Sequence, residues 1–340
     1  MLTAVLKQLI DRQDLDAASA TQAMTAIMTG EAGEAMTAAL LVALRCKGEK
    51  AHEVTAFVRS MRKAALVWPE ATGDLCDTCG TGGDGRGTIN ISTLSALLLA
   101  SLGHSVAKHG NRAVSSTSGS ADLLEELGLK LDRSVEDVIV DLRRSRICFL
   151  FAPLWHPAMR HAAPVRRSLG IRTVFNMLGP LTNPAPVAYQ SVGVFDPELL
   201  ELMAEVLCSL DRKLAYVIHS QDGLDEISPE VPTRYIRVEQ GRVVEKGELR
   251  PEDFGVRPFA LSRIQVPDKK EAFSRAQALI RGAGLEEDRT IVAMNAALLH
   301  GGRRGLSLKD AYEECRSELQ SGRLESILKS WIERIPLPSN

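Results

Sequence analysis

The sequence lacks a long hydrophobic run and a marked excess of either charge, and each absence excludes a class of protein. No apolar run reaches the roughly 18–20 residues that a membrane-spanning helix needs. Acidic side chains also occur too near the beginning of the sequence for a secretion signal. The formal net charge is −2, whereas proteins that bind nucleic acid usually carry a basic face. We therefore expect a cytoplasmic protein, with no membrane and no nucleic acid as its main partner.

The six cysteines show no framework of regular spacing. The exception is Cys76-Asp-Thr-Cys79, the spacing of redox dithiols and of half a zinc site. A zinc site would need a second pair, which the sequence does not have. A thioredoxin-like motif would open a helix, whereas this one leads into glycines. We interpret Cys76 and Cys79 as two small residues near the end of a strand.

The chain is long enough for two domains, and its beginning predicts the first of them. Its 340 residues are 45% hydrophobic and 25% charged, an ordinary globular composition. The first 65 residues are rich in alanine and place apolar side chains at helical spacing, as in the stripe from Leu2 to Ile10. This pattern predicts a small all-helical domain over residues 1–69, and a dimer interface lined by helices is one use for its apolar stripes.

From about Gly73 the pattern changes to strands that alternate with helices. Strands are expected at 75–79, 105–107, 147–152, 190–195 and 214–219, and a hairpin at 234–238 and 242–246. Such alternation predicts a mostly parallel central sheet flanked by helices, and helices return from Lys269 onward. The fold class is therefore α/β: a small all-helical domain plus a larger α/β domain over residues 70–340.

A glycine turn, Gly80–Gly87, is the first candidate binding element. It holds five glycines in eight residues and follows a strand, where ligand sites of α/β sheets lie. Glycines let backbone N–H groups approach an anion closely. The spacing matches neither GxxxxGK[ST] nor GxGxxG, so the usual nucleotide-binding interpretations fail. A flexible hairpin turn is the alternative, although it would require fewer glycines.

Two polar segments follow the glycine turn. Asn90–Thr93 precedes an apolar helix, and we expect one of its side chains to cap that helix while the others remain for a phosphate. Lys108–Arg112 is expected as a basic loop after a short strand, and a run of hydroxyl residues continues to Ser120. Lysine and arginine around a glycine suit a polyanion, and an exposed loop without a ligand is the alternative.

Two more distant groups could complete a site. Asp222, Asp225 and Glu226 follow a strand, and hard carboxylate oxygens at that place suit Mg²⁺, although acidic loops are common. Farther back, if the residues around Arg166 are helical, Arg166 points toward an apolar surface and Arg167 toward solvent. A buried guanidinium needs a carboxylate partner, which could be a structural Asp or Glu or a substrate acid.

Together these segments resemble the anthranilate phosphoribosyltransferase family. The resemblance spans nearly the whole chain and rests on GTGGDG, NIST, KHGNR with SSTSGSAD, FLFAPLWHPAMRHAAPVRRSLGIRT, FNMLGPLTNP and DGLDEIS, in that order. It implies a nucleoside phosphorylase/phosphoribosyltransferase-like fold, in which a segment near 165–185 returns to the helical domain, and a homodimer formed by the helical parts. The implied reaction, in tryptophan biosynthesis, joins the anthranilate amine to the phosphoribosyl group of phosphoribosyl pyrophosphate (PRPP) and releases pyrophosphate.

The resemblance also implies roles for individual residues. PRPP would be held by Gly80, Gly83, Asp84, Thr88, Asn90, Ile91, Ser92, Thr93, Lys108, His109, Gly110, Asn111, Arg112, Ala113, Val114, Ser115, Ser116 and Ser120. Anthranilate would be bound by Gly80, Asn111 and Arg166, and Mg²⁺ by Ser92, Asp225 and Glu226. Displacement at an anomeric carbon helped by a metal needs no covalent nucleophile, and we expect neither a nucleophile nor a general base.

Some positions depart from the pattern of the family, and two other functions remain as alternatives. Trp155 replaces a common tyrosine, HSQDGLDE replaces a usual His-Gly approach, and Glu230-Val231 interrupts a customary Gly-Pro-Thr. A pyrimidine nucleoside phosphorylase shares the architecture but would need a nucleobase site. Relatives that bind nucleic acid have lost the substrate motifs, which are intact here.

Overall fold

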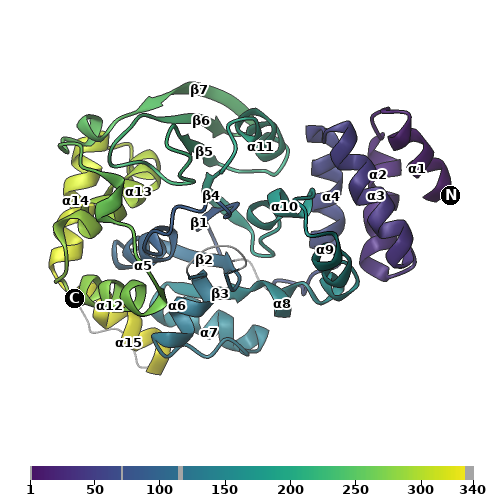
Figure 1. The fold of residues 1–340 in the computed structure, drawn as a ribbon. Helices are drawn as coiled ribbons and strands as arrows, with labels where there is room; N and C mark the ends of the chain where they lie inside the picture. Colours follow the sequence, from purple (N-terminus) through teal and green to yellow (C-terminus); the bar gives the residue numbers. More distant parts are fainter. Residues whose placement is uncertain (1, 70–71, 114–117, 334–340) are drawn as a thin grey trace.

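The protein consists of a helical bundle packed beside an α/β unit (Figure 1), and the computed structural model describes residues 2–69, 72–113 and 118–333. The bundle contains α1 (Leu2–Ile10), α2 (Ala17–Thr29), α3 (Gly33–Lys47) and α4 (Ala51–Lys63). Asp16 caps α2 by accepting the Ser19 N–H at 2.7 Å, and Gly30 ends it with a left-handed φ of 81°. The predicted helical region is confirmed. None of the helices in the described residues is long and apolar enough to span a membrane.

A seven-stranded sheet forms the centre of the α/β unit. Its strands are β1 (Leu75–Gly80), β2 (Ser105–Gly110), β3 (Ile147–Phe151), β4 (Val187–Gly193), β5 (Leu214–Ser220), β6 (Thr233–Glu239) and β7 (Arg242–Leu249). Their order is β3-β2-β1-β4-β5-β6-β7, parallel from β3 to β5 and antiparallel for the last two. The mostly parallel sheet is confirmed. Because strand order reverses between β1 and β4, a crevice for ligands is expected at the carboxyl ends of these two strands.

Helices cover both faces of the sheet. They are α5 (Ile91–Ser101), α6 (Ser120–Glu126), α7 (Val135–Ser145), α11 (Leu199–Cys208), α12 (Lys269–Ile280), α13 (Glu286–Arg304), α14 (Leu308–Gln320) and α15 (Arg323–Glu333). Alternate residues of β5 enter different cores: Tyr216 and Ile218 join the core with α5 and α13, and Ala215 and Val217 join the core with α11. This second core is continuous with that of the helical bundle.

Residues 152–181 connect the bundle to the sheet (Figure 1). They form α8 (Ala152–Trp155), a 3₁₀ turn (Pro157–His161), α9 (Ala163–Leu169) and α10 (Phe175–Leu181), rather than a single helix. The break follows from Pro164, which stands in the first turn of α9. α9 contacts α3, and α10 contacts α4. We call α9, α10 and the residues between them the α9–α10 segment. The domain boundary at residues 69 and 70 stays a prediction.

Two local predictions were wrong. Lys108–Gly110 is not a loop but the end of β2, because these residues pair in register with Phe149–Phe151 of β3. The helix after the glycine turn begins at Ile91 and has no side-chain cap. The Asn90 amide instead donates a hydrogen bond to the Ser118 carbonyl at 2.9 Å, so it joins two loops rather than capping α5.

Candidate active site

Two glycines bring the loop after β5 against the ends of β1 and β4. A Cβ atom on Gly193 would overlap the backbone carbonyl of Asp225, and one on Gly80 would overlap its carboxylate. A side chain at Gly193 would therefore clash with backbone, and one at Gly80 would have to displace the Asp225 carboxylate. The Asp225 Oδ2 atom accepts the backbone N–H of Gly82 at 2.9 Å. The sheet thus places an acidic loop directly over the glycine turn, at the point where strand order reverses.

Carboxylates gather at this position without enough positive charge to balance them. Loss of solvation, together with the nearby Asp84 carboxylate, raises the pKa of Asp225 to about 7. Burial and the charge of Asp225 also raise the pKa of Glu226, although Lys108 opposes the shift. Hard oxygen atoms whose negative charges repel one another fit Mg²⁺, which would relieve that repulsion. In the described part of the chain, no three His, Cys, Asp or Glu side chains form a ready metal cage. A cation here would therefore need further oxygen ligands from a bound molecule.

The N-terminus of α5 faces the same carboxylates. The Ser92 backbone N–H, in the first turn of α5, lies close enough to the Glu226 carboxylate to favour its charged form and so oppose the rise in its pKa. Lys108 is only 2% exposed, and its Nζ donates to the Thr78 carbonyl at 2.7 Å and to Ser92 Oγ at 3.4 Å. Lys108 therefore lies beneath the glycine turn and can orient the Ser92 hydroxyl.

His109 is buried on the other side of β2 from Lys108. Its Nδ1 atom is 3.1 Å from the Gly179 carbonyl, and its ring lies 5.1 Å from that of His156 between centroids. Burial and the neighbouring His156 lower the pKa of His109 to about 3, so its ring stays neutral near pH 7.

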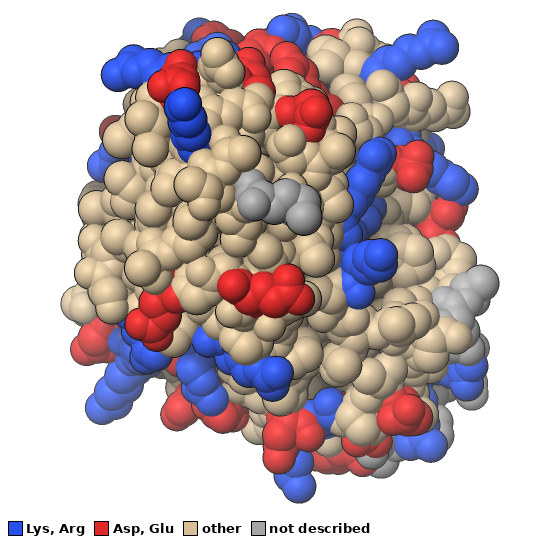
Figure 2. All heavy atoms as spheres, turned by 90° about the vertical axis from the view of Figure 1, so that its right-hand side faces the viewer, with Lys and Arg blue, Asp and Glu red and all other residues tan. Residues whose placement is uncertain are grey.

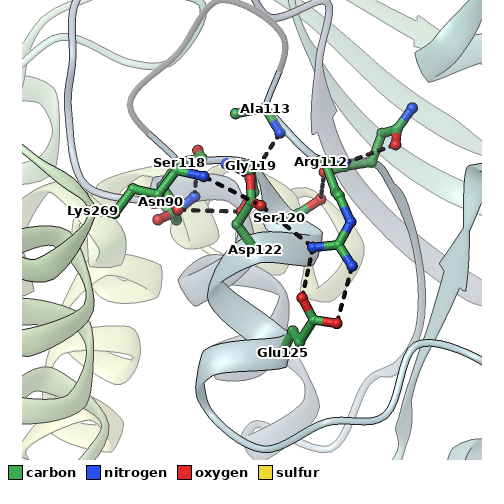
Figure 3. A network of polar contacts seen from close by, with 10 residues as sticks. Asn90, Arg112, Ala113, Ser118, Gly119, Ser120, Asp122, Glu125 and Lys269 are labelled. Atoms are coloured by element: carbon green, nitrogen blue, oxygen red, sulfur yellow. Dashed lines mark hydrogen bonds and ion pairs between the residues drawn. The ribbon is translucent and has the colours of Figure 1, made fainter.

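A polar network closes the base of the loop that follows β2 (Figure 3). The Asp122 Oδ2 atom accepts the N–H groups of Ala113 and Gly119 at 2.8 and 2.9 Å. Arg112 forms a two-bonded ion pair with Glu125 at 2.6 and 3.0 Å, so its charge is already compensated. Ser120 Oγ lies 3.3 Å from the Asn111 carbonyl. The predicted residues Val114, Ser115 and Ser116 lie outside the described residues.

Arg166 is presented by α9 as a half-buried guanidinium. It lies 5.2 Å from the centroid of the Phe175 ring, and burial lowers its pKa. No hydrogen bond or ion pair joins its guanidinium to another of the residues described. Arg167 is exposed, as predicted. Of the two partners considered for Arg166, a structural carboxylate is therefore not found among these residues.

Comparison with known proteins places this geometry in a family. The sequence matches the glycosyl transferase family twice, as its helical bundle domain over residues 3–65 and as its a/b domain over residues 72–324. The anthranilate phosphoribosyltransferase of Desulfatibacillum aliphaticivorans is 42% identical, with 97% of this chain and 98% of the relative aligned. That of Moorella thermoacetica is 42% identical over 98% and 99% of the two chains. The chain belongs to the anthranilate phosphoribosyltransferase family.

Solved structures of the family agree with this assignment. The anthranilate phosphoribosyltransferase of Thermus thermophilus superposes with a TM-score of 0.90 at 40% identity, over 97% of this chain and 98% of that one. The enzyme of Saccharomyces cerevisiae, solved in complex with PRPP and Mg, superposes with a TM-score of 0.90 at 25% identity, over 98% and 97% of the two chains.

Most of the described candidate residues of the anthranilate phosphoribosyltransferase motifs converge on one edge of the sheet. The glycine turn, the start of α5, the end of β2 and the Asp225 loop all meet there, while Arg166 comes from the α9–α10 segment. The sequence interpretation missed Arg172, whose Nη2 donates to the Gly83 carbonyl at 2.7 Å. Nothing in the local sequence distinguishes Arg172 from Arg167. It also missed Asp77, which is fully buried and accepts a hydrogen bond from Asn183 at 2.9 Å.

The departures from the family pattern have local structural roles. Trp155 packs against Trp68 with tilted rings whose centroids are 5.9 Å apart, and its carbonyl accepts the Leu66 N–H at 2.9 Å. Glu230 accepts the Leu261 N–H at 2.8 Å. Trp155 thus joins α8 to the chain that follows α4, and Glu230 fastens the outer part of the loop after β5.

Proposed function

We propose that this chain transfers the phosphoribosyl group of PRPP to the amine of anthranilate, giving N-(5-phosphoribosyl)anthranilate and pyrophosphate. The observation that carries the proposal is a group of carboxylates at one edge of the sheet and a guanidinium on the segment beside it. Carboxylates with raised pKa values and helix N–H groups meet at the glycine turn. A half-buried guanidinium without an acidic partner among the described residues lies on the neighbouring segment. The names of the relatives support the same reaction.

The donor is PRPP, and of the residues named for it from the sequence we assign those that meet at this edge of the sheet, namely the glycine turn, the start of α5 and Lys108. Backbone N–H groups of the glycine turn and of the α5 N-terminus would bind its phosphates. Lys108 would act from below, by orienting the Ser92 hydroxyl. Asp225 and Glu226, with Ser92, would hold Mg²⁺, which when bound stabilises the negative charge of the leaving pyrophosphate.

The acceptor is anthranilate, bound through its carboxylate by Arg166. A guanidinium that is already partly desolvated loses little solvation when a carboxylate arrives, so the ion pair is worth more than one at the surface. Asn111 and Gly80 would contact the same ligand near the donor. Because an aniline nitrogen is neutral near pH 7, holding it close to the anomeric carbon supplies much of the rate without a general base.

We also propose a homodimer through the outer face of the bundle. Figure 2 views the molecule from the bundle side and shows a broad face with few charged side chains. α1, α3 and the α9–α10 segment carry apolar side chains that are partly or fully exposed: Leu2, Leu6, Ile10, Met36, Val42 and Ile171. Ile10 is 65% exposed and Ile171 is 50% exposed. Contiguous exposed apolar surface is typical of an interface. A cytoplasmic location stays a prediction.

A coupled assay tests the reaction. With Mg²⁺ present, pyrophosphate should be released from PRPP only when anthranilate is added, and the product should carry the phosphoribosyl group on nitrogen. Phosphorolysis of thymidine or uridine, with no turnover of anthranilate, would overturn the proposal in favour of a nucleoside phosphorylase. DNA binding that weakens with salt, without turnover, would overturn it in favour of a binding protein. Sedimentation of the protein and of Ile10→Glu tests the dimer, which the substitution should weaken.

A further inference from the structure

Arg172 joins two parts of the molecule that carry different substrates in the proposed reaction. It lies between α9 and α10, in the α9–α10 segment that packs on the bundle and presents Arg166. Its Nη2 atom donates to the Gly83 carbonyl of the glycine turn at 2.7 Å. A side chain from the acceptor side therefore holds the backbone of the donor side.

A second contact fixes the direction of the Arg172 side chain. Its guanidinium carbon lies 3.7 Å above the centroid of the Phe195 ring. The Phe195 N–H donates to Thr81 Oγ1 at 3.2 Å, and the Thr81 N–H donates to the Gly193 carbonyl at 2.9 Å. The ring on which Arg172 stacks is thus itself tied to the start of the glycine turn.

The contact with Gly83 controls one peptide unit of the turn. A peptide unit is planar and trans, so its carbonyl and the following N–H point in opposite directions. Holding the Gly83 carbonyl toward Arg172 therefore sets the direction of the Asp84 N–H. Glycine at position 83 has a φ of 78° and can adopt many other conformations, so this peptide needs an external restraint. The N–H of Gly82 already has one, the Asp225 carboxylate.

We propose that Arg172 is a positioning residue that couples the α9–α10 segment to the glycine turn, holding the Gly83–Asp84 peptide ready for the phosphates of PRPP. This rests on the proposed function. Arg172 acts through the backbone of the turn, so its loss should weaken the binding of PRPP more than that of anthranilate. Arg172 is exposed, and neither of its two contacts is part of a hydrophobic core. Its removal should therefore leave the stability of the fold unchanged.

The test compares Arg172→Ala, Arg172→Lys and Phe195→Leu with the matched control Arg167→Ala, an exposed arginine of the same segment. Steady-state kinetics would give kcat and the KM of each substrate, and thermal unfolding would give Tm. For Arg172→Ala we expect the KM for PRPP to rise about tenfold, with the KM for anthranilate and the Tm near those of the wild type. Arg172→Lys and Phe195→Leu should show smaller rises in the KM for PRPP, because each loses one of the two contacts and retains the other.

Two results would overturn the inference. One is a KM for PRPP in Arg172→Ala equal to that in Arg167→Ala. The other is a lower Tm and a lower kcat with no selective change for PRPP, which would make the residue merely structural. The proposed function is tested separately by the wild-type protein, because absence of Mg²⁺-dependent turnover of PRPP with anthranilate would refute that function whatever the variants do.

Discussion

The two ends of the central sheet differ in how charged side chains are compensated. At the amino ends of the strands, charged and polar groups are paired. Lys213 binds Asp74 at 2.8 Å, and His300 lies between His104 at 2.7 Å and Glu314 at 2.8 Å. Arg303 contacts His104 and the sulfur of Cys76. At the carboxyl ends, carboxylates face carboxylates.

This difference separates the residues that stabilise the fold from those that serve a ligand. Like charges that approach each other in a partly buried place cost stability, so they persist where a bound molecule compensates them. Asp225 and Glu226 have raised pKa values because burial removes their solvation and neighbouring carboxylates repel their negative charges. Substitutions at the carboxyl end should therefore change activity without lowering stability, and those at the amino end should do the reverse.

The largest expected effect is that of Asp225→Asn, which sharpens the comparison. Removing one negative charge should lower kcat/KM by about a hundredfold or more, because the substitution weakens the binding of the metal that stabilises the leaving pyrophosphate. Its Tm should be equal to or above that of the wild type, since repulsion with Asp84 and Glu226 is relieved. Both quantities are measurable on one preparation.

Asp222→Asn is the matched control for that variant. Asp222 accepts hydrogen bonds from the Leu224 N–H at 3.0 Å and from the Ser228 hydroxyl at 2.7 Å, so it is a structural residue of the same loop. This variant should keep most of its activity. A marked fall in the Tm of Asp225→Asn would contradict the proposed distinction.

Arg166→Ala should have the next largest effect. Without the guanidinium, the KM for anthranilate should rise about thirtyfold, the range of a hydrogen bond to a charged group, while the KM for PRPP changes little. Because Arg166 has no acidic partner among the described residues and loses only its packing on Phe175, the Tm should fall little. Arg167→Ala, the exposed neighbour, should match the wild type, and an unchanged KM for anthranilate in Arg166→Ala would rule out the assigned carboxylate contact.

At the opposite end of the sheet, Arg303→Met should lower stability and spare catalysis. The substitution removes contacts with His104 and Cys76 and the packing of the guanidinium on Tyr189, 4.6 Å from the ring centroid. We expect the free energy of unfolding to fall by about 2 kcal/mol, measured by urea denaturation. Values of kcat/KM below half that of the wild type would show that the two ends are not independent.

The last expected effect is a difference in pH dependence, which vanishes near pH 7 and grows as the pH falls. Burial, with His300, Arg303 and Arg304 nearby, lowers the pKa of His104 to about 3. The unfolded chain binds a proton at this histidine below about pH 6.5, whereas the folded chain does not until about pH 3. The contribution of His104 to the free energy of unfolding is therefore complete above pH 6.5 and is lost as the pH falls.

Between pH 6 and 4, stability should depend on pH less steeply in His104→Gln than in the wild type, by about 1.4 kcal/mol per pH unit. His109 and His156, which also have lowered pKa values, act in the same direction in both proteins. The difference between the two slopes therefore isolates His104. Parallel slopes would show that His104 does not titrate as described.

The sequence predicted the elements that depend on local pattern and missed those that depend on distant partners. The glycine turn and the acidic loop were found because strand ends and clustered glycines are visible in a short window. Lys108 was expected in a loop, but its strand is defined by pairing with Phe149, 41 positions away. Arg112 was expected to meet a phosphate as a free cation, and its ion pair with Glu125 requires the fold of α6. Arg172 acquires its role only when the α9–α10 segment reaches the glycine turn.

The clearance around Gly193 and Gly80 has a consequence for protein engineering. Neither position has room for even a methyl group, because the Asp225 backbone and carboxylate occupy that space. A larger residue at either position would displace the inner half of the loop after β5, whereas the outer half already departs from the family pattern at Glu230-Val231. Libraries that aim at a new aromatic acceptor should leave the strand ends unchanged and vary the surroundings of Arg166, where the ligand's shape can change without displacing the acidic loop.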